Sequence, residues 1–177
     1  PSKKNPPVIH YPDKDEYFEE AKEYVETHFS NHLGELTSYS LYPTSFETTK
    51  SWLSQFFEHR FMEFGVYEDA IVKENSILNH SVLSPMMNVG LITPKEVITN
   101  CLAYAKDNDV PINSVEGFVR QIIGWREFIR GVYEVKGSEE RTTNFWNFKN
   151  KIPPSFYDGT TGIDPIDQTI KKLLQTG

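Results

Sequence analysis

The segment Asn79–Pro85 carries side chains that could hold an anion. It reads Asn-His-Ser-Val-Leu-Ser-Pro, so two serines precede a proline that can occupy the first turn of a helix. Serine hydroxyls and the free backbone N–H groups at a helix start are common ligands of phosphate. The same residue types suit an ordinary helix N-cap, and residue types alone leave both interpretations open.

A second segment, Glu116–Tyr133, carries three glycines spaced seven residues apart within a helical pattern: Gly117, Gly124 and Gly131. Each glycine in a helix interior costs about 1 kcal/mol relative to alanine. Because successive members of the set share one face, the spacing predicts that something bulky approaches the backbone closely, either another helix or a ligand.

Three further side chains lie on adjacent parts of this helix: Gln121, Trp125 and Arg126. A guanidinium can bind a pyrophosphate through two parallel hydrogen bonds, and an indole ring offers a stacking surface for a base. The alternative is a packed core helix whose arginines are exposed or ion-paired, and composition alone does not exclude it.

Composition bounds the class of protein. A chain of 177 residues suits one domain or part of a larger one, and 12 Phe, 9 Tyr and 3 Trp can fill a sizeable core. The one cysteine, Cys101, excludes an internal disulfide framework and a multi-cysteine metal site made by this chain alone. No apolar run approaches the roughly 20 residues of a membrane helix, and residues 1–12 do not resemble a signal peptide. We therefore expect a soluble, cytoplasmic protein.

The charge is uneven along the chain. In total, 18 Lys and Arg against 25 Asp and Glu give a net charge of −7, which argues against a dedicated nucleic-acid binder. Residues 117–151, however, hold seven basic and four acidic side chains, a local excess of three positive charges. This excess has the right sign for phosphate, and solvated charges on a helix face are the alternative.

Apolar periodicity predicts an all-α fold, a multi-helical bundle without a convincing strand. The first helix is expected from a cap at Asp13 to about Phe29. Its predicted buried face consists of Phe18, Ala21, Tyr24, Val25 and Phe29. From Phe46 a helix with an aromatic stripe is expected to end at Gly65. That stripe is predicted to be core and consists of Trp52, Leu53, Phe56, Phe57, Arg60, Phe61 and Phe64.

Three more helices are predicted further along. A capping box over residues 93–96 opens the first, and its inward side chains are Val97, Ile98, Cys101, Leu102 and Ala105. Asn113 or Ser114 caps a long helix over about residues 115–135, closed by Gly137. The last helix is capped by Asp164 and stops at Gly177. Residues 36–42 alternate too weakly to be a strand.

Several common catalytic and metal-binding patterns are absent from the sequence. It contains no GxGxxG, P-loop, HExxH or GxSxG motif and no zinc spacing. His28 and His32 are four residues apart, but they straddle a predicted helix end, which favours a surface pair over a metal site.

Three runs in this sequence resemble the flavin-binding helical domain of the photolyase/cryptochrome superfamily. They are VEGFVRQIIGWREFIRGVY, NHSVLSPMMNVGLITPKEV upstream of it, and FGVYEDAI before that. The closest resemblance is to the prokaryotic branch of photolyase-related proteins, which includes the bacterial (6-4) photolyases. Residues 46–177 match the pattern in order and spacing.

The resemblance implies a domain organisation and a chemistry. Residues 1–45 would be the linker and connecting helix between an antenna domain and the helical domain, and residues 46–177 the first part of the helical FAD-binding domain. In photolyases, light-excited reduced FAD donates an electron to a pyrimidine dimer that has been flipped out of damaged DNA. The expected cofactor is therefore FAD, and the expected partner of the full-length parent is damaged DNA.

The resemblance also assigns site residues. His80, Ser81, Val82, Leu83 and Ser84 match the family's phosphate-binding turn, Thr-Ser-x-Leu-Ser, with histidine replacing its first hydroxyl residue. Arg126 matches the arginine that reaches the flavin phosphates, while Tyr67 and Gln121 are expected near the cofactor. Trp125 matches the tryptophan that stacks on the flipped lesion. The expected DNA contacts are Trp125, Arg120 and Arg130. One additional residue, Gly124, moves Gln121 from three to four positions before Trp125.

Two departures from the family change what this chain is expected to do. The family continues beyond the point that matches Gly177, into the second wall of the cofactor pocket. For the 177 residues alone we expect weak or no FAD binding, no repair activity, docking to the C-terminal half of the domain, and self-association through exposed apolar surface. Iron–sulfur members place their first cysteine where Pro165 stands here, so no iron–sulfur cluster is expected.

Two alternatives remain beside the photolyase-like enzyme. A cryptochrome-type blue-light photoreceptor would use the same half of the domain without repairing DNA, so whether the parent is an enzyme stays open. The other alternative is a non-catalytic helical interaction module that has lost cofactor binding.

Overall fold

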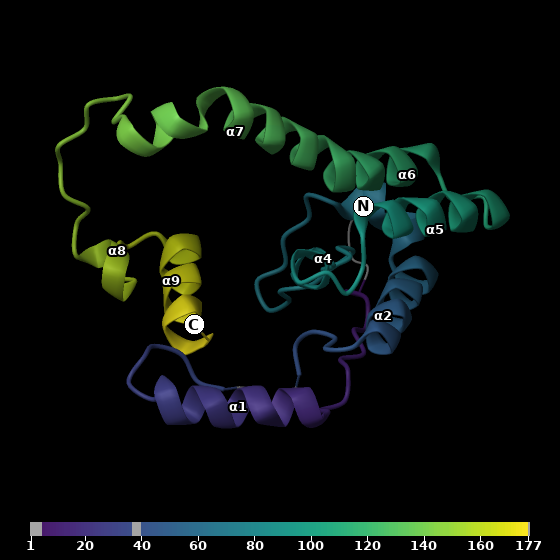
Figure 1. Ribbon diagram of the computed structural model, residues 1–177, viewed down its shortest axis with the longest axis horizontal. Coiled ribbons are helices and arrows are strands. Elements are labelled where there is room, and N and C mark those ends of the chain that lie inside the picture. The colour runs from purple at the N-terminus through teal and green to yellow at the C-terminus, as the bar shows by residue number, and fades with distance from the viewer. Residues whose placement is uncertain (1–4, 37–39, 177) are drawn as a thin grey trace. The chain divides into compact units, whose positions relative to one another are not determined.

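The computed structural model describes residues 5–36 and 40–176 of the chain. The predictions that fall on residues 1–4, on residues 37–39 and on the helix stop at Gly177 lie outside these residues. Within the described ranges all regular secondary structure is helical, and the one β-type contact is an isolated bridge between Val72 and Asn75 (Figure 1). The all-α prediction is therefore confirmed. None of the helices described is long and apolar enough to cross a membrane.

The chain divides into two compact units, and each is treated by itself. The first consists of residues 1–12 and 41–137, and the second of residues 13–40 and 138–177. The division expected from the sequence, at residue 45, remains a prediction about domain organisation.

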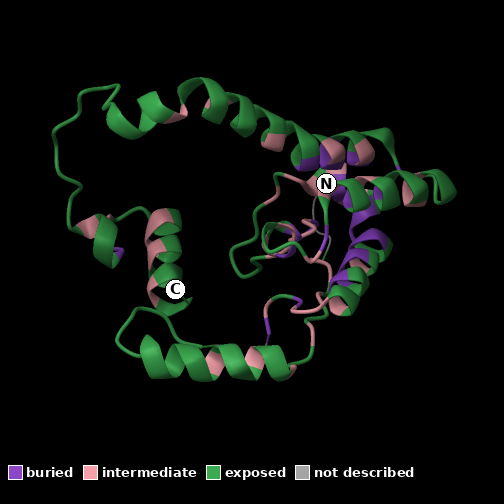
Figure 2. Cartoon of the chain, in the orientation of Figure 1, coloured by how far each residue is buried: buried purple, intermediate pink, exposed green. Residues whose placement is uncertain are grey.

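The first unit is built around α2 (Phe46–His59), which carries the aromatic stripe into the core. All seven predicted stripe residues are buried, and Figure 2 shows buried residues gathering on α2 and α6 (Ile112–Val119). Phe118 of α6 joins this core, with its ring centroid 4.8 Å from that of Phe56 and 5.5 Å from that of Phe61. Aromatic rings at these separations bury a large apolar area, so this cluster is the main stabilising feature of the unit.

The sequence predicted that the aromatic helix ends at Gly65, and this prediction is wrong. After α2 the chain forms a short 3-10 turn, η1 (Phe61–Glu63), and then α3 (Phe64–Tyr67), which contains Gly65. A Cβ at Gly65 would lie 2.6 Å from the backbone carbon of Asn113, so glycine is needed for α3 to approach α6 this closely. The residue serves close packing, which local sequence rules do not distinguish from a helix stop.

The predicted N-cap of the long helix is also wrong. Pro111 occupies the cap position of α6, whereas Asn113 and Ser114 lie inside the helix. The buried Ser114 hydroxyl donates to the Met62 carbonyl at 3.1 Å and accepts from the Gly65 N–H at 2.9 Å. Ser114 therefore joins α6 to the turn before α3 instead of capping its own helix.

Beyond α6 the chain continues as a π-helical segment, η2 (Arg120–Gly124), and then as α7 (Trp125–Thr142). Gly137, the predicted helix end, lies within α7, since one glycine costs only about 1 kcal/mol and helix-forming residues follow it. The close approach predicted at the three glycines occurs only at Gly117, where a Cβ would lie 3.0 Å from Glu68 Oε2. At Gly124 the one near atom belongs to Arg120 of the same segment, and none of the described residues approaches Gly131.

The helix predicted from the capping box is confirmed as α5 (Pro94–Asp107). Thr93 Oγ1 accepts from the Glu96 N–H, while the Glu96 carboxylate accepts from the Thr93 N–H at 2.8 Å. Val97 and Cys101 are buried as expected, but Leu102 is 52% exposed, which contradicts its predicted inward position. Burial raises the pKa of the Cys101 thiol to about 12, so this cysteine is an inert core residue.

The second unit holds α1 (Glu16–His28), α8 (Ser155–Asp158) and α9 (Asp164–Thr176). Asp15, not Asp13, caps α1 by accepting from the Phe18 N–H at 3.0 Å. The predicted buried face of α1 is wrong, because none of its residues is buried. Asp164 is the first residue of α9, and the side chain of Asp167 accepts the N–H groups of Thr161 and Gly162 that precede the helix.

Candidate functional site

The candidate phosphate-binding turn, His80–Ser84, is held to the aromatic core through its carbonyl groups. The Trp52 indole N–H donates to the Ser81 carbonyl at 2.8 Å, and Arg60 Nη1 donates to the His80 carbonyl at 3.0 Å. Both donors come from or directly follow α2, so the aromatic stripe that builds the core also positions this turn. Leu83 anchors the turn as a buried side chain, and α4 (Ser84–Asn88) begins directly after it.

Val82 gives the turn its shape. Its φ angle is +53°, a left-handed conformation that is rare for any residue except glycine and unusual for a β-branched one. The next residue, Leu83, returns to right-handed angles, with φ −91° and ψ −11°. A disfavoured conformation of this kind persists only where surrounding contacts enforce it, and such positions gather at ligand sites.

Arg60 is a buried cation beneath this turn. It is 1% exposed, and its guanidinium lies 5.5 Å from the ring centroids of both Trp52 and Phe56. Asn79 donates to the Arg60 carbonyl at 3.1 Å, which ties the start of the turn to the same place. The sequence predicted Arg60 as part of the core stripe but gave it no role in the site. The one indication of such a role in the sequence was a charged residue at an otherwise apolar position.

Glu68 gathers three of the predicted site residues, a role that the sequence did not reveal. Its carbonyl lies 2.8 Å from His80 Nε2, and its carboxylate lies 3.6 Å from Arg120 Nη2 and 3.4 Å from Gln121 Nε2. His80, Arg120 and Gln121 therefore meet around one residue. The only signal for it in the sequence was its place in the FGVYEDAI run.

Arg126 lies against the helix that follows the turn. Its Nη1 donates to the Ile122 carbonyl at 2.8 Å, and its Nη2 lies 3.5 Å from the sulfur of Met87 in α4. No carboxylate lies within ion-pair distance of this guanidinium in the part of the chain that the structure describes. The arginine predicted to bind phosphate is thus half-buried, in contact with α4, and without a negative partner among the described residues.

The π-helical segment η2 contains Gly124, the residue that the resemblance to the family makes an additional one. A π-bulge accommodates one extra residue in a helix without breaking it, and such bulges are frequent at functional sites. Here the bulge begins at Arg120, which pairs with Glu68, and ends directly before Trp125, which opens α7. It therefore sets the orientation of Gln121 relative to Trp125 and Arg126.

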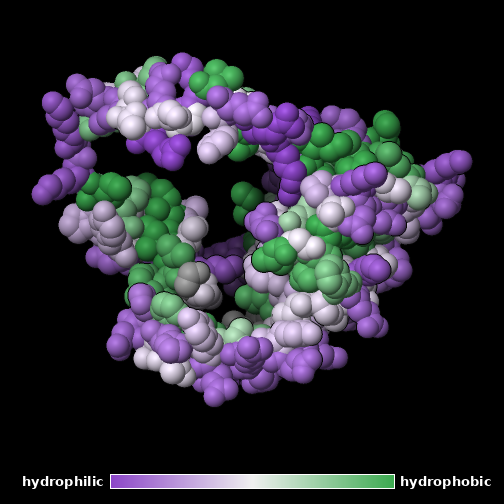
Figure 3. Space-filling model, in the orientation of Figure 1, coloured by the Kyte–Doolittle hydropathy of each residue, from purple (hydrophilic) through white to green (hydrophobic). Residues whose placement is uncertain are grey.

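Trp125 is 63% exposed and forms an apolar surface with its neighbours. Its ring meets that of Phe128 edge to face at 5.7 Å, and Arg120, Gly124, Trp125 and Phe128 line an open pocket of about 330 Å³. Apolar groups interrupt the hydrophilic surface over α7 in the space-filling view (Figure 3). Such a surface can stack on a base, as the sequence predicts for Trp125.

Two predicted site residues lie apart from this group. Arg130 is exposed and ion-paired on its own helix, with Nη1 3.5 Å from Glu127 Oε2 and Nε 3.1 Å from Glu134 Oε1. Tyr67 lines a different pocket, of about 560 Å³, together with His59, Leu78 and the segment 5–7. None of the other predicted site residues is among the described residues that line that pocket.

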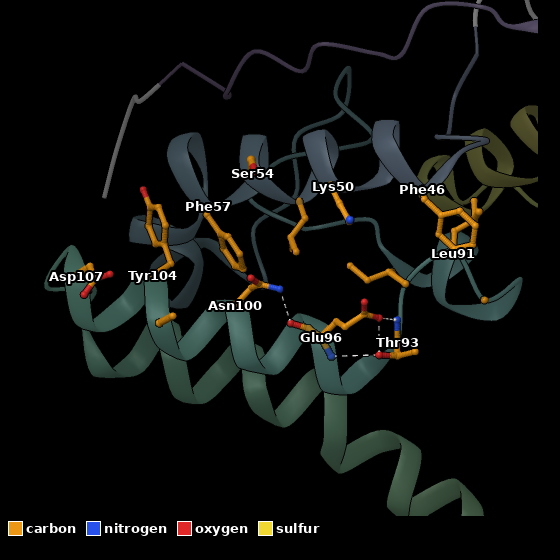
Figure 4. Close-up of a pocket in the computed structure, with 14 residues that line it drawn as sticks. Phe46, Lys50, Ser54, Phe57, Leu91, Thr93, Glu96, Asn100, Tyr104 and Asp107 are labelled. Carbon is orange, nitrogen blue, oxygen red and sulfur yellow. Dashed lines mark hydrogen bonds between the residues drawn. The ribbon is translucent and has the colours of Figure 1, made fainter.

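A pocket of about 720 Å³ between α2 and α5 contains none of the predicted site residues (Figure 4). Its polar lining includes Lys50, Thr93, Glu96 and Asn100, and the Glu96 carboxylate is already engaged in the capping box. Hydrogen bonds from Thr93 lower the pKa of Glu96. No cluster of three or more His, Cys, Asp or Glu able to hold a metal is found in residues 5–36 and 40–176.

Comparison with known proteins gives two relatives. No family model matches the chain. Over 161 residues, 91% of the chain, it is 30% identical to a (6-4) photolyase of Agrobacterium fabrum, of which the match covers 32%. Over 113 residues, 63% of the chain, it is 40% identical to the uncharacterized protein R853 of Acanthamoeba polyphaga mimivirus, of which it covers 86%. The chain belongs to the same family as the mimivirus protein, and it spans about a third of the length of the photolyase that it resembles.

Proposed function

We propose that this chain forms the part of a photolyase-like flavoprotein that holds the phosphates of FAD. The observation that carries the proposal is the position of Arg126, which has no carboxylate partner among the described residues and lies against α4 directly after the His80–Ser84 turn. The similarity of 91% of the chain to a (6-4) photolyase supports the same assignment.

The donors at this place suit a pyrophosphate. The hydroxyls of Ser81 and Ser84, the backbone N–H groups of the turn and the Arg126 guanidinium are all hydrogen-bond donors, and the guanidinium carries the positive charge that a diphosphate requires. Gln121 is proposed to lie near the cofactor. FAD, when bound, supplies the light-driven electron-transfer chemistry, and the chain supplies binding and orientation.

The surface around Trp125 is proposed as the place where damaged DNA is recognised. An exposed indole beside Phe128 offers a stacking surface for a single-stranded or flipped base. Arg120 lines the same pocket, with its guanidinium paired to Glu68 and Glu116. Arg130 is proposed to contact DNA only at the periphery of this surface, because its guanidinium is already paired with Glu127 and Glu134. A lesion-cleavage assay separates a repair enzyme from a photoreceptor that uses the same cofactor.

A second candidate is a helical interaction module without cofactor, and the mimivirus relative favours it. The 113 matched residues make up 86% of the mimivirus protein, so that relative consists of little more than the matched segment. In such a module the turn and Arg126 would serve packing alone.

Competition for FAD tests the proposal. We would measure FAD binding to the protein purified from its complete gene, with ADP and riboflavin as competitors. ADP carries the diphosphate, whereas riboflavin carries the flavin ring without phosphate. We expect ADP to displace FAD and riboflavin to leave it bound. Absence of FAD binding, or displacement by riboflavin as effective as by ADP, would contradict the proposal.

A further inference from the structure

We propose that Trp52 and Arg60 are positioning residues for the phosphate-binding turn: they hold two of its carbonyls toward the core, so that the following backbone N–H groups face outward to an anion. Arg60 also places a positive charge beneath that anion. This inference rests on the proposed function, and it assigns a role to two residues of the aromatic core that binding motifs do not include.

The geometry of the peptide bond gives the first step. In a trans peptide the carbonyl of one residue and the N–H of the next point in opposite directions, and no cis peptide occurs in the described residues. The His80 carbonyl points to Arg60 Nη1 and the Ser81 carbonyl to Trp52 Nε1. The N–H groups of Ser81 and Val82 are therefore turned away from the core.

Three consecutive backbone N–H groups of the turn have no partner among the residues that the structure describes. Among the described residues, no hydrogen-bond acceptor is found for the backbone N–H groups of Ser81, Val82 and Leu83. Leu83 is only 1% exposed, and buried N–H groups are nearly always paired in folded proteins. Three consecutive unpaired donors beside a buried side chain indicate that an acceptor comes from outside the described chain.

The backbone angles bring these donors together. A left-handed residue next to a right-handed one curves the chain so that successive N–H groups point into one concavity, an arrangement that binds anions. Val82 at φ +53° followed by Leu83 at φ −91° provides the change of hand. Because valine disfavours positive φ, the two hydrogen bonds from the core are needed to keep it there.

The charge of Arg60 points to the same ligand. Its Nε and Nη2 are buried and have no hydrogen-bond partner, and no carboxylate pairs with it in the part of the chain described. Burial lowers its pKa to about 10, which leaves the guanidinium protonated at neutral pH. A buried cation without a counter-ion is costly, and an anion bound on the turn above it would offset part of that cost.

Amide chemical shifts of the isotopically labelled chain, titrated with inorganic pyrophosphate, test the inference. The variants are Trp52→Phe, which keeps an aromatic ring but removes the indole N–H, and Arg60→Lys, which keeps the charge but removes the guanidinium fork. Arg141→Lys is the matched control, because Arg141 is an exposed arginine in the last turn of α7 and belongs to none of the proposed sites. Melting temperatures of all four proteins show whether each variant is folded.

We expect pyrophosphate to shift the amide signals of residues 81–84 in the unmodified chain. Losing one positioning hydrogen bond should weaken this binding about tenfold in Trp52→Phe and in Arg60→Lys, and should leave binding by Arg141→Lys unchanged. If the Trp52→Phe variant is folded and binds like the unmodified chain, the positioning role is wrong while the phosphate site stands. If the unmodified chain shows no response at residues 81–84, this inference fails, whereas the proposed function fails only if the protein from its complete gene does not bind FAD.

Discussion

Replacing Arg126 by alanine should separate a binding role from a packing role. In the structure this guanidinium donates one hydrogen bond to the Ile122 carbonyl, four residues before it, and a weak one to the sulfur of Met87. A half-buried hydrogen bond of this kind contributes about 1 kcal/mol, and alanine returns part of that through its higher helix propensity. We therefore expect the free energy of unfolding to fall by about 1 kcal/mol or less.

The expected loss of FAD affinity is larger. A hydrogen bond from a charged group contributes about 1.5–3 kcal/mol, which corresponds to about 10- to 150-fold in the dissociation constant. Equilibrium dialysis of FAD against the protein from its complete gene measures the affinity, and urea unfolding measures the stability. Arg130→Ala is the control, since it removes two exposed ion pairs and leaves the turn untouched. Unchanged FAD affinity in Arg126→Ala, or an equal loss in both variants, would refute the reasoning.

Three further predictions follow from other parts of the chain. Because burial raises the pKa of Cys101 to about 12, its thiol should react with a thiol reagent at mildly alkaline pH only after unfolding; rapid reaction of the folded protein would contradict its buried position. The pKa of Glu96 is lowered because Thr93 donates hydrogen bonds to its carboxylate, so Glu96→Gln should lower the stability of the protein at neutral pH. This difference in stability should vanish as the pH falls through the lowered pKa. A difference that persists in acid would count against the capping-box role. The exposed side chains of Trp125, Phe128 and Ile129 should promote self-association of the chain. Phe128→Glu should therefore lower the sedimentation coefficient measured across a concentration series. If both proteins sediment as monomers at every concentration, this surface does not self-associate.

The features that the sequence predicted well depend on local spacing. The aromatic stripe of α2 and the capping box of α5 each depend on residues three or four positions apart, and both occur as expected. Helix ends were less predictable, because a glycine can end a helix or permit close packing. Gly65 permits the approach of α3 to α6, and Gly137 is simply tolerated within α7.

The candidate site was predictable only in part, for a similar reason. The turn and Arg126 were found from their residue types and their resemblance to a family. The groups that position them were not, because Trp52 and Arg60 are distant in sequence and looked like core residues. Glu68 joins His80 to Arg120 and Gln121 through contacts that span up to 53 positions, and no local pattern encodes such contacts.

The most direct test of the central claim is a visible absorption spectrum of the protein purified from its complete gene, before and after blue light with a reductant. If the chain holds the phosphates of FAD in a photolyase-like protein, the spectrum should show oxidised-flavin bands that bleach on illumination. A colourless protein that also fails to take up added FAD would contradict the account and leave the helical interaction module as the better description.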